Sequence, residues 1–336
     1  FRELVRRAQA LDDSLHPEWR ATPVERPVFI FASARSGTTM LHRLLALDEE
    51  RWATIKLYQT IFPTVTAERA FERIRSASAL DPFARAVPKA LDATFFDVWK
   101  GVHPLSLDVE EEDECLFVFA GSSPTLTLLL PFADELAETC DLDARPLAER
   151  EAFLDYYEGC LRRFLHSNGG GRRLLNKNVF LGPRLRSLAG RFTDAQFVFL
   201  VRHPYESLGS YLSMWHRGWA VHRPEIAKDS DETRAFARMA LRHYRDALAR
   251  RAAMGDRLLV VRYDDLARDP ERTVSDLYAG LDEPVTREFR EELRRAADRQ
   301  KDYKSEHAYA LEEFGIDRDF LHREIPEVYA EFGFER

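Results

Sequence analysis

The feature that most constrains this chain is a short apolar run that leads into a glycine-containing turn and then into a second apolar run. Residues 27–31 read Pro-Val-Phe-Ile-Phe, the composition of a strand covered on both faces. Residues 40–47 have the apolar density of a helix that packs on a sheet. The turn between them lies at a helix N-terminus, where free N–H groups and the helix dipole bind phosphate. The sequence therefore predicts a phosphate-binding loop in an α/β fold.

The residues of this turn differ from those of a nucleotide-hydrolysing P-loop. In such a loop a Lys follows the last Gly and reaches the β- and γ-phosphates. Here Gly37 is followed by Thr38 and Thr39, and the nearest cation is Arg35, inside the loop. This arrangement suits a nucleotide with one 5′-phosphate that carries a small group. A P-loop kinase or NTPase is the alternative, which the missing Lys and the lack of an acidic Mg²⁺-binding partner disfavour.

A second motif predicts a second phosphate site. Residues 195–202 form another apolar strand, which ends in Arg202, and His203-Pro204 then begins a helix. Ser210 lies two turns into that helix, so Arg202 and Ser210 can converge on an anion. Two phosphate sites on neighbouring parallel strands indicate a nucleotide phosphorylated at both the 5′ and 3′ positions.

With both motifs in view, the chain resembles the sulfotransferase superfamily, and its bacterial members in particular, over residues 27–316. Family members use 3′-phosphoadenosine 5′-phosphosulfate (PAPS) as donor and release adenosine 3′,5′-bisphosphate (PAP). The resemblance implies in-line transfer of a sulfuryl group to a hydroxyl, less often an amine, of a small-molecule, lipid or glycan acceptor, without a metal. The residues that it assigns to the 5′-phosphosulfate loop are Arg35, Ser36, Gly37, Thr38 and Thr39, and those that it assigns to the 3′-phosphate are Arg202 and Ser210.

Further residues match the family in the same order along the chain. Lys177 ends a strand and corresponds to the Lys near the bridging oxygen, so it joins Arg35 as a catalytic candidate. Tyr263 corresponds to the Tyr beside the adenine. The segment that closes over the nucleotide in bacterial members is matched by Lys304, Ser305 and His307.

The general base is the point at which this sequence departs from the family. Relatives often place a His two or four residues after the strand-end Lys, and those positions hold Val179 and Leu181. A carboxylate from the acidic run 108–114 is the preferred alternative, with Glu111 or Glu112 as the base. The same run could instead complement the dipole of the apolar helix that follows it. His103 is the next candidate.

The expected architecture is one domain over residues 1–336. Residues 27–62 and 170–316 form a nucleotide-binding core around a parallel sheet flanked by helices, and residues 63–169 form a mainly helical insertion on the acceptor side. The expected strands are 27–31, 52–55, 173–177, 195–202 and 257–262. Aromatic residues that could border the acceptor, although most of them individually are better explained as core residues, are Phe95, Phe96, Trp99, Phe117, Phe119, Trp215 and Trp219.

Charge, cysteine content and apolar runs limit the classes of partner and the cellular setting that we expect. The formal net charge of −8 argues against a nucleic-acid-binding surface. Three cysteines fit no metal-ligand spacing and favour free thiols in a reducing, cytoplasmic setting, and no N-terminal signal is visible. The apolar run 125–132 is too short to cross a bilayer. The helical stretch 231–253 could serve as a dimer face or pack in the core, so the oligomeric state stays open. The absence of an evident base keeps a non-catalytic nucleotide-binding protein of sulfotransferase ancestry as a further alternative.

Overall fold

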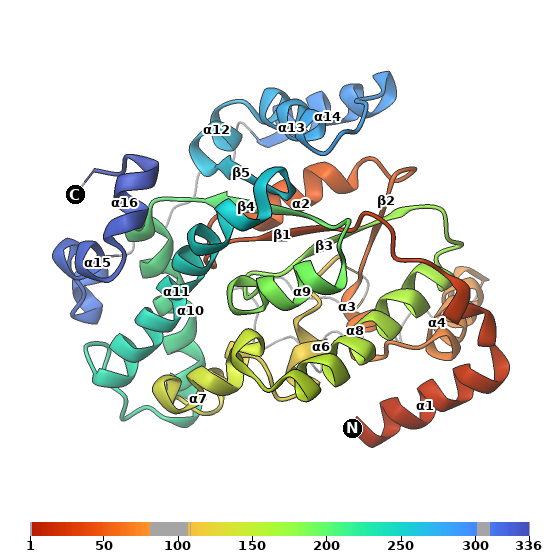
Figure 1. Cartoon of the computed structure of the whole chain (residues 1–336), viewed down its shortest axis with the longest axis horizontal. Coiled ribbons are helices and arrows are strands. Elements are labelled where there is room, and N and C mark those ends of the chain that lie inside the picture. The colour runs from red at the N-terminus through yellow and green to blue at the C-terminus, as the bar shows by residue number, and fades with distance from the viewer. Residues whose placement is uncertain (1, 81–106, 108, 301–309, 336) are drawn as a thin grey trace.

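The structure, a computed structural model, describes residues 2–80, 107, 109–300 and 310–335. At its centre lies a five-stranded sheet with the order β2-β3-β1-β4-β5, in which every neighbouring pair is parallel (Figure 1). The strands are β1 (Val28–Phe31), β2 (Trp52–Thr54), β3 (Arg173–Lys177), β4 (Gln196–Val201) and β5 (Leu258–Arg262). All five predicted strands are present to within one residue at each end, so the predicted α/β class with a central parallel sheet is confirmed.

Both faces of the sheet are covered, as the unbroken apolar composition of β1 requires. Phe29 and Phe31 pack into one core, and Val28 and Ile30 pack into a second core on the opposite face. Figure 1 shows the helices of the second core on one side of the sheet, namely α2 (Thr38–Ala46), α12 (Tyr263–Arg268), α13 (Pro270–Gly280) and α14 (Arg287–Gln300).

A larger group of helices covers the other face (Figure 1). It comprises α6 (Glu114–Phe119), α7 (Ala133–Cys140), α8 (Leu147–Ser167), α9 (Leu185–Arg191), α10 (Pro204–His222) and α11 (Asp231–Met254). The outlying helices are α1 (Arg2–Leu15), α3 (Leu57–Ile61), α4 (Val65–Leu80), α15 (Arg318–Glu324) and α16 (Pro326–Phe332). The described part of residues 63–169 contains helices but no strand, and its Glu110 forms an isolated antiparallel bridge with Lys56.

The strand order brings the predicted site elements together. β1 lies between β3 and β4, and Ile30 is in register with Lys177 on one side and with Val198 on the other. The chain therefore leaves β1, β3 and β4 at the same edge of the sheet. Ligands of open α/β sheets bind at this edge, where the strand order reverses.

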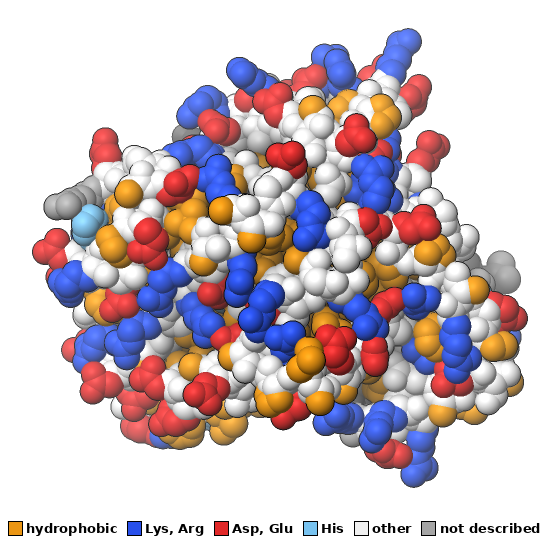
Figure 2. All heavy atoms as spheres, in the orientation of Figure 1, with side chains coloured by type: hydrophobic (Ala, Val, Ile, Leu, Met, Phe, Trp, Pro, Cys, Tyr) orange, Lys and Arg blue, Asp and Glu red, His pale blue; other side chains and the backbone are white. Residues whose placement is uncertain are grey.

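Two features of the structure relate to the composition, namely the distribution of surface charge and the state of the three cysteines. Figure 2 shows Lys and Arg interspersed with Asp and Glu over the visible face, without a large field of one sign. Cys115, Cys140 and Cys160 are free, and burial raises their thiol pKa values to about 11, about 11 and about 12. Among the described residues, no helix combines the length and apolar character that a bilayer span requires.

Candidate functional site

The loop between β1 and α2 contains two residues with left-handed backbone conformations. Arg35 has φ +66° and Gly37 has φ +92°. A Cβ atom on Gly37 would lie 2.6 Å from Cδ2 of Tyr263, so a side chain at this position would overlap the tyrosine ring. The helix α2 begins immediately afterwards, at Thr38. Turns of this kind present successive N–H groups and a helix N-terminus to an anion.

The loop after β1 and the helix after β4 are in direct contact. Nε of Arg35 donates to Oγ of Ser210 at 3.1 Å, and Nη1 of Arg202 donates to the carbonyl oxygen of Arg35 at 3.1 Å. The guanidinium of Arg202 also lies 4.3 Å from the centre of the Tyr263 ring. The two predicted phosphate sites therefore form one continuous patch that carries two guanidinium groups.

Lys177 lies beside this patch, at the end of β3. Although only 1% of the residue is exposed, three side-chain oxygen atoms lie close to its ammonium group. Nζ lies 3.3 Å from Oγ1 of Thr39, 3.4 Å from Oε1 of Glu111 and 3.5 Å from Oε1 of Glu112. The structure thus brings both carboxylates that were predicted as bases to the predicted catalytic Lys. The Glu111 and Glu112 side chains are 11% and 20% exposed, so both carboxylates are only partly accessible.

The last four residues of the acidic run, 111–114, lie in two different environments. Glu111 and Glu112 face Lys177, whereas Asp113 and Glu114 point into the protein and are buried. The dipole interpretation fits only the last two residues, since Glu114 lies in the first turn of α6 and Asp113 is its N-cap residue, although the Asp113 side chain makes no capping hydrogen bond. The run therefore holds two carboxylates beside the Lys and two others in the interior.

The buried carboxylates are satisfied by side chains of β3 and its neighbours. Asp113 accepts hydrogen bonds from Tyr157 Oη, Asn176 Nδ2 and Asn178 Nδ2. Burial raises the pKa of Asp113 to about 6 even though these hydrogen bonds favour the ionised form. Glu114 accepts from both terminal nitrogens of Arg184, at 2.6 Å and 2.8 Å.

Sequence reasoning missed four residues that lie near Lys177 or hold the buried acidic residues, namely His42, Asn176, Asn178 and Arg184. Two asparagines that flank a Lys at the end of a buried strand are a usable signal, because buried amides need partners. His42 could have been found from its place one helical turn after Thr39 in α2. It is 2% exposed, and burial together with the charge of Lys177 lowers its pKa to about 3, so the imidazole is neutral.

The structure describes four of the aromatic residues considered for the acceptor side, and three of them are core residues, whereas Phe119 is half-buried. Phe117, Trp215 and Trp219 are buried in the hydrophobic core, which agrees with the core interpretation of these residues. The two indoles are held in place because Trp215 Nε1 donates to Thr127 Oγ1 and Trp219 Nε1 donates to the Thr127 carbonyl oxygen. The predicted residues that lie outside the described part of the chain are Phe95, Phe96, Trp99, His103, Lys304, Ser305 and His307.

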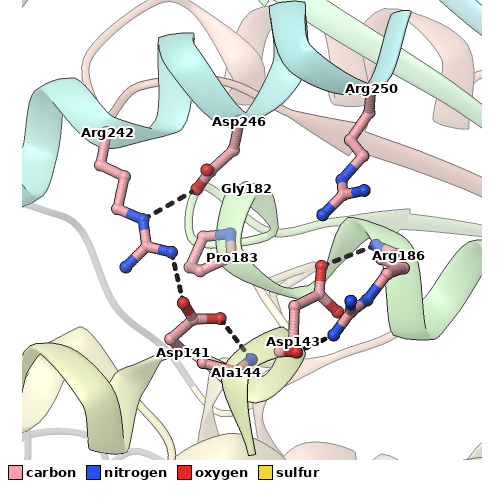
Figure 3. Close-up of a pocket in the computed structure, with 9 residues that line it drawn as sticks. All are labelled: Asp141, Asp143, Ala144, Gly182, Pro183, Arg186, Arg242, Asp246 and Arg250. Carbon is pink, nitrogen blue, oxygen red and sulfur yellow. Dashed lines mark hydrogen bonds and ion pairs between the residues drawn. The ribbon is translucent and has the colours of Figure 1, made fainter.

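A cavity of about 180 Å³ lies elsewhere in the structure (Figure 3). Arg242 bridges Asp141 and Asp246 across it, the Arg186 guanidinium donates to the backbone carbonyl oxygen of Asp143, and the Arg250 guanidinium points into it (Figure 3). None of the residues that line it belongs to the predicted donor site or to the Lys177 group. It is therefore a separate feature of the α11 surface.

Comparisons with known proteins agree with this geometry. The curated relatives include the omega-hydroxy-beta-dihydromenaquinone-9 sulfotransferase Stf3 of Mycobacterium bovis and that of Mycobacterium tuberculosis, each 26% identical over 259 residues. The match covers 76% of this chain and 62% of those relatives, so the chain spans less than two thirds of their length.

Two solved structures share the fold over nearly the whole chain. Sulfotransferase STF9 from Mycobacterium avium has a TM-score of 0.79 and 22% identity, with 98% of this chain and 83% of that chain covered. Sulfotransferase STF1 from Mycobacterium tuberculosis has a TM-score of 0.70 and 21% identity, with 96% and 81% covered. Residues 27–287 match the family model described as the sulfotransferase family. Because that match takes in most of the chain, the protein belongs to the sulfotransferase family.

Proposed function

We propose that this chain transfers a sulfuryl group from PAPS to a hydroxyl of an acceptor. The observation that carries the proposal is the position of Lys177. Its ammonium group contacts the predicted donor loop through Thr39 and two carboxylates through Glu111 and Glu112. A cation between a phosphate-binding loop and a candidate base is what sulfuryl transfer needs, because negative charge develops on the oxygen of the leaving group.

The residues of the donor site suit a nucleotide with two separate phosphates. In the proposal the 5′-phosphosulfate is held by Arg35, Ser36, Gly37, Thr38 and Thr39. Arg202 and Ser210 hold the 3′-phosphate, and Tyr263 lies beside the adenine. The direct contacts of Arg35 with Ser210 and with Arg202 support one nucleotide spanning both groups. The fit of the Gly37 turn against the Tyr263 ring supports the same assignment.

The chemistry follows from the groups around Lys177. PAPS supplies the sulfuryl group. Glu111, with Glu112 beside it, accepts the proton of the acceptor hydroxyl as the new oxygen–sulfur bond forms. The bond from sulfur to the bridging oxygen breaks, that oxygen keeps the electron pair, and Lys177 stabilises the charge. The products are the sulfated acceptor and PAP.

For the acceptor, we propose a hydroxyl carried by a hydrophobic compound. The support is the name of the curated relative, which acts on an omega-hydroxylated dihydromenaquinone and is 26% identical over 76% of this chain. An amine acceptor is disfavoured, because a protonated amine would be attracted to Glu111 and Glu112 without becoming nucleophilic.

Calorimetry with PAP, adenosine 5′-monophosphate and ATP–Mg²⁺ tests the donor assignment. We expect PAP to bind at least about tenfold more tightly than the monophosphate, because Arg202 and Ser210 add charged hydrogen bonds to the 3′-phosphate. Arg202→Ala should remove that preference. Arg268→Ala is the matched control, because Arg268 is an exposed arginine that pairs with Asp265.

Transfer of radiolabelled sulfate from PAPS to a panel of alcohols tests the reaction itself. The panel contains a long-chain primary alcohol, a hydroxylated prenyl quinol, a phenol and a hexose, and we expect the first two to be preferred. Tighter binding of ATP–Mg²⁺ than of PAP would support the kinase alternative instead. Tight PAP binding without transfer to any member of the panel would support a non-catalytic nucleotide-binding protein.

A further inference from the structure

The two faces of β3 carry different polar groups at its carboxyl end. Lys177 lies on the face of α2, where Nζ reaches Thr39. Asn176 and Asn178 lie on the opposite face, where they reach Asp113. This division follows from the alternation of side chains along a strand. The acidic residues 111–114 therefore extend around the end of β3, with contacts on both faces.

Asn178 uses its whole side chain to hold this segment. Its Nδ2 donates to Oδ1 of Asp113 at 2.6 Å and to Oε2 of Glu114 at 2.7 Å. Its Oδ1 accepts from the backbone N–H of Phe180 at 2.8 Å, which fixes the orientation of the amide. The backbone N–H of Asn178 donates to the carbonyl oxygen of Ile30 in β1. Asn178 is fully buried, so bulk solvent does not compete for these partners.

Other buried groups complete the anchor. Tyr157 Oη and Asn176 Nδ2 both donate to Oδ2 of Asp113. The guanidinium of Arg184 pairs with both oxygens of Glu114 and lies 3.6 Å from the centre of the Phe117 ring. Two adjacent carboxylates are thus tied to β3, α8 and the segment that follows β3.

The other end of the segment is tied to the main chain near β2. The N–H of Glu111 donates to the carbonyl oxygen of Ile55 at 3.0 Å, and the N–H of Leu57 donates to that of Val109 at 3.1 Å. Glu111 is therefore held by its own backbone bond, and only Glu112 lies between it and the Asp113–Glu114 anchor. The distances of the Glu111 and Glu112 carboxylates to Lys177 thus depend on these two fixed ends.

We propose that Asn178 is a positioning residue, which holds the Glu111 and Glu112 carboxylates at their distance from Lys177 by fixing Asp113 and Glu114. This inference rests on the proposed function for the role of the two glutamates. Asn178 itself faces away from Lys177 and stays out of the reaction. The Asn178 amide donates to both Asp113 and Glu114. Removing this amide therefore leaves one oxygen of each carboxylate without that hydrogen bond.

The test compares Asn178→Ala with the unchanged chain. We expect kcat to fall by about 10- to 100-fold, because small displacements of a catalytic group cost about that much, while KM for PAPS and the Kd for PAP change by less than about twofold. The acceptor is the member of the alcohol panel that is turned over fastest. Amide hydrogen exchange of residues 109–117, measured at the same time, should accelerate by about tenfold, because the anchor of this segment is lost.

A matched pair of Tyr→Phe variants separates positioning from general loss of stability. Tyr157 and Tyr278 are both fully buried and both donate to a buried Asp, but Tyr278 does so to Asp48, in the core on the opposite face of the sheet. Tyr157→Phe should lower kcat and speed exchange of residues 109–117, whereas Tyr278→Phe should change neither. Tyr157→Phe leaves two donors to Asp113, so it keeps the test available if Asn178→Ala does not fold.

The outcomes distinguish the inference from the function on which it rests. Exchange and kcat of Asn178→Ala and Tyr157→Phe that match those of Tyr278→Phe would overturn the positioning role. A Glu111→Gln variant with unchanged kcat would overturn the carboxylate base and therefore also the catalytic purpose of the anchor. If the unchanged chain binds no PAP, the donor assignment fails, and the exchange measurement still decides whether Asn178 fixes the segment.

Discussion

Arg35 and Ser210 share a hydrogen bond of 3.1 Å between Nε and Oγ, although 175 residues separate them in the chain. The contact joins the loop after β1 to the helix after β4. It therefore places the cation predicted for the 5′ side of the donor within reach of the hydroxyl predicted for the 3′ side.

The first prediction concerns this pair. Arg35→Ala and Ser210→Ala should each weaken PAP binding by about 10-fold or more, because each removes a hydrogen bond to a charged group. In the double variant the losses should be less than additive, by about 0.5–3 kcal/mol, since the two residues touch. Calorimetric titration of the four proteins completes the cycle. Strict additivity would mean that the two residues bind the nucleotide independently.

The second prediction concerns the turn of the donor loop. Gly37→Ala should lower the free energy of unfolding by about 2 kcal/mol and weaken PAP binding, because φ is +92° and a Cβ would overlap the Tyr263 ring. Gly190→Ala is the control, since Gly190 lies in α9 and a Cβ atom there would meet no neighbouring group within 4 Å. That change should raise stability by about 0.5–1 kcal/mol. Urea denaturation measures both. Equal effects of the two changes would contradict a special role for the Gly37 turn.

The third prediction concerns Lys177. Lys177→Met keeps the apolar stem and removes the charge, so transfer should slow by about 100- to 1,000-fold, more than PAP binding weakens. Lys228→Met is the control, because Lys228 is an exposed lysine paired with Glu313. Single-turnover transfer from PAPS measures the chemical step directly. A Lys177→Met protein that transfers at the normal rate would exclude the role of this Lys in stabilising the leaving group.

The fourth prediction concerns acid stability. Burial, the charge of Lys177 and that of Arg43 lower the pKa of His42 to about 3, against an opposing contribution from Glu111. The unfolded chain therefore binds a proton at His42 below its ordinary pKa of 6.5, whereas the folded chain does not, so stability is lost as the pH falls from about 6.5. At about 1.4 kcal/mol for each pH unit, the loss at pH 4 is about 3 kcal/mol.

His42→Asn tests this expectation, because Asn keeps an N–H donor and does not titrate. Its unfolding free energy should fall less steeply between pH 7 and pH 4 than that of the unchanged chain. Asp113 contributes in the opposite direction, since its pKa is raised to about 6 and its stabilising effect is lost as the pH rises through that value. The difference between the two proteins isolates His42, and parallel pH curves would show that it is not buried in the neutral form.

The sheet could be predicted because its signals are local. Most strands contain a short apolar run, such as residues 28–31 and 197–201, and the residue types that follow β1 (Arg35 and Gly37) and β4 (Arg202) are tied to their chemistry. The strand that ends in Lys177 was also expected from the sequence, and the register of Lys177 with Ile30 places it beside β1.

The surroundings of Lys177 were harder to predict, since they depend on contacts between distant segments. The four acidic residues 111–114 are nearly equivalent in sequence, and only packing against β3 divides them into a pair beside Lys177 and a buried pair. The helical spacing of apolar residues also does not determine which way the aromatic side chains point, because Trp215 and Trp219 could face a ligand or the core. Their indole hydrogen bonds to Thr127 place them in the core.

The alternation of Asn176, Lys177 and Asn178 also limits how the gene can change. Deleting or adding one codon within β3 would exchange the two faces, so that an amide would take the place of the ammonium group and the ammonium group would enter the anchor. Length changes are absorbed more easily just upstream, where Gly169, Gly170 and Gly171 have open space around them. We therefore expect homologous chains to vary in length before β3 and to keep the spacing from its first residue to the Lys.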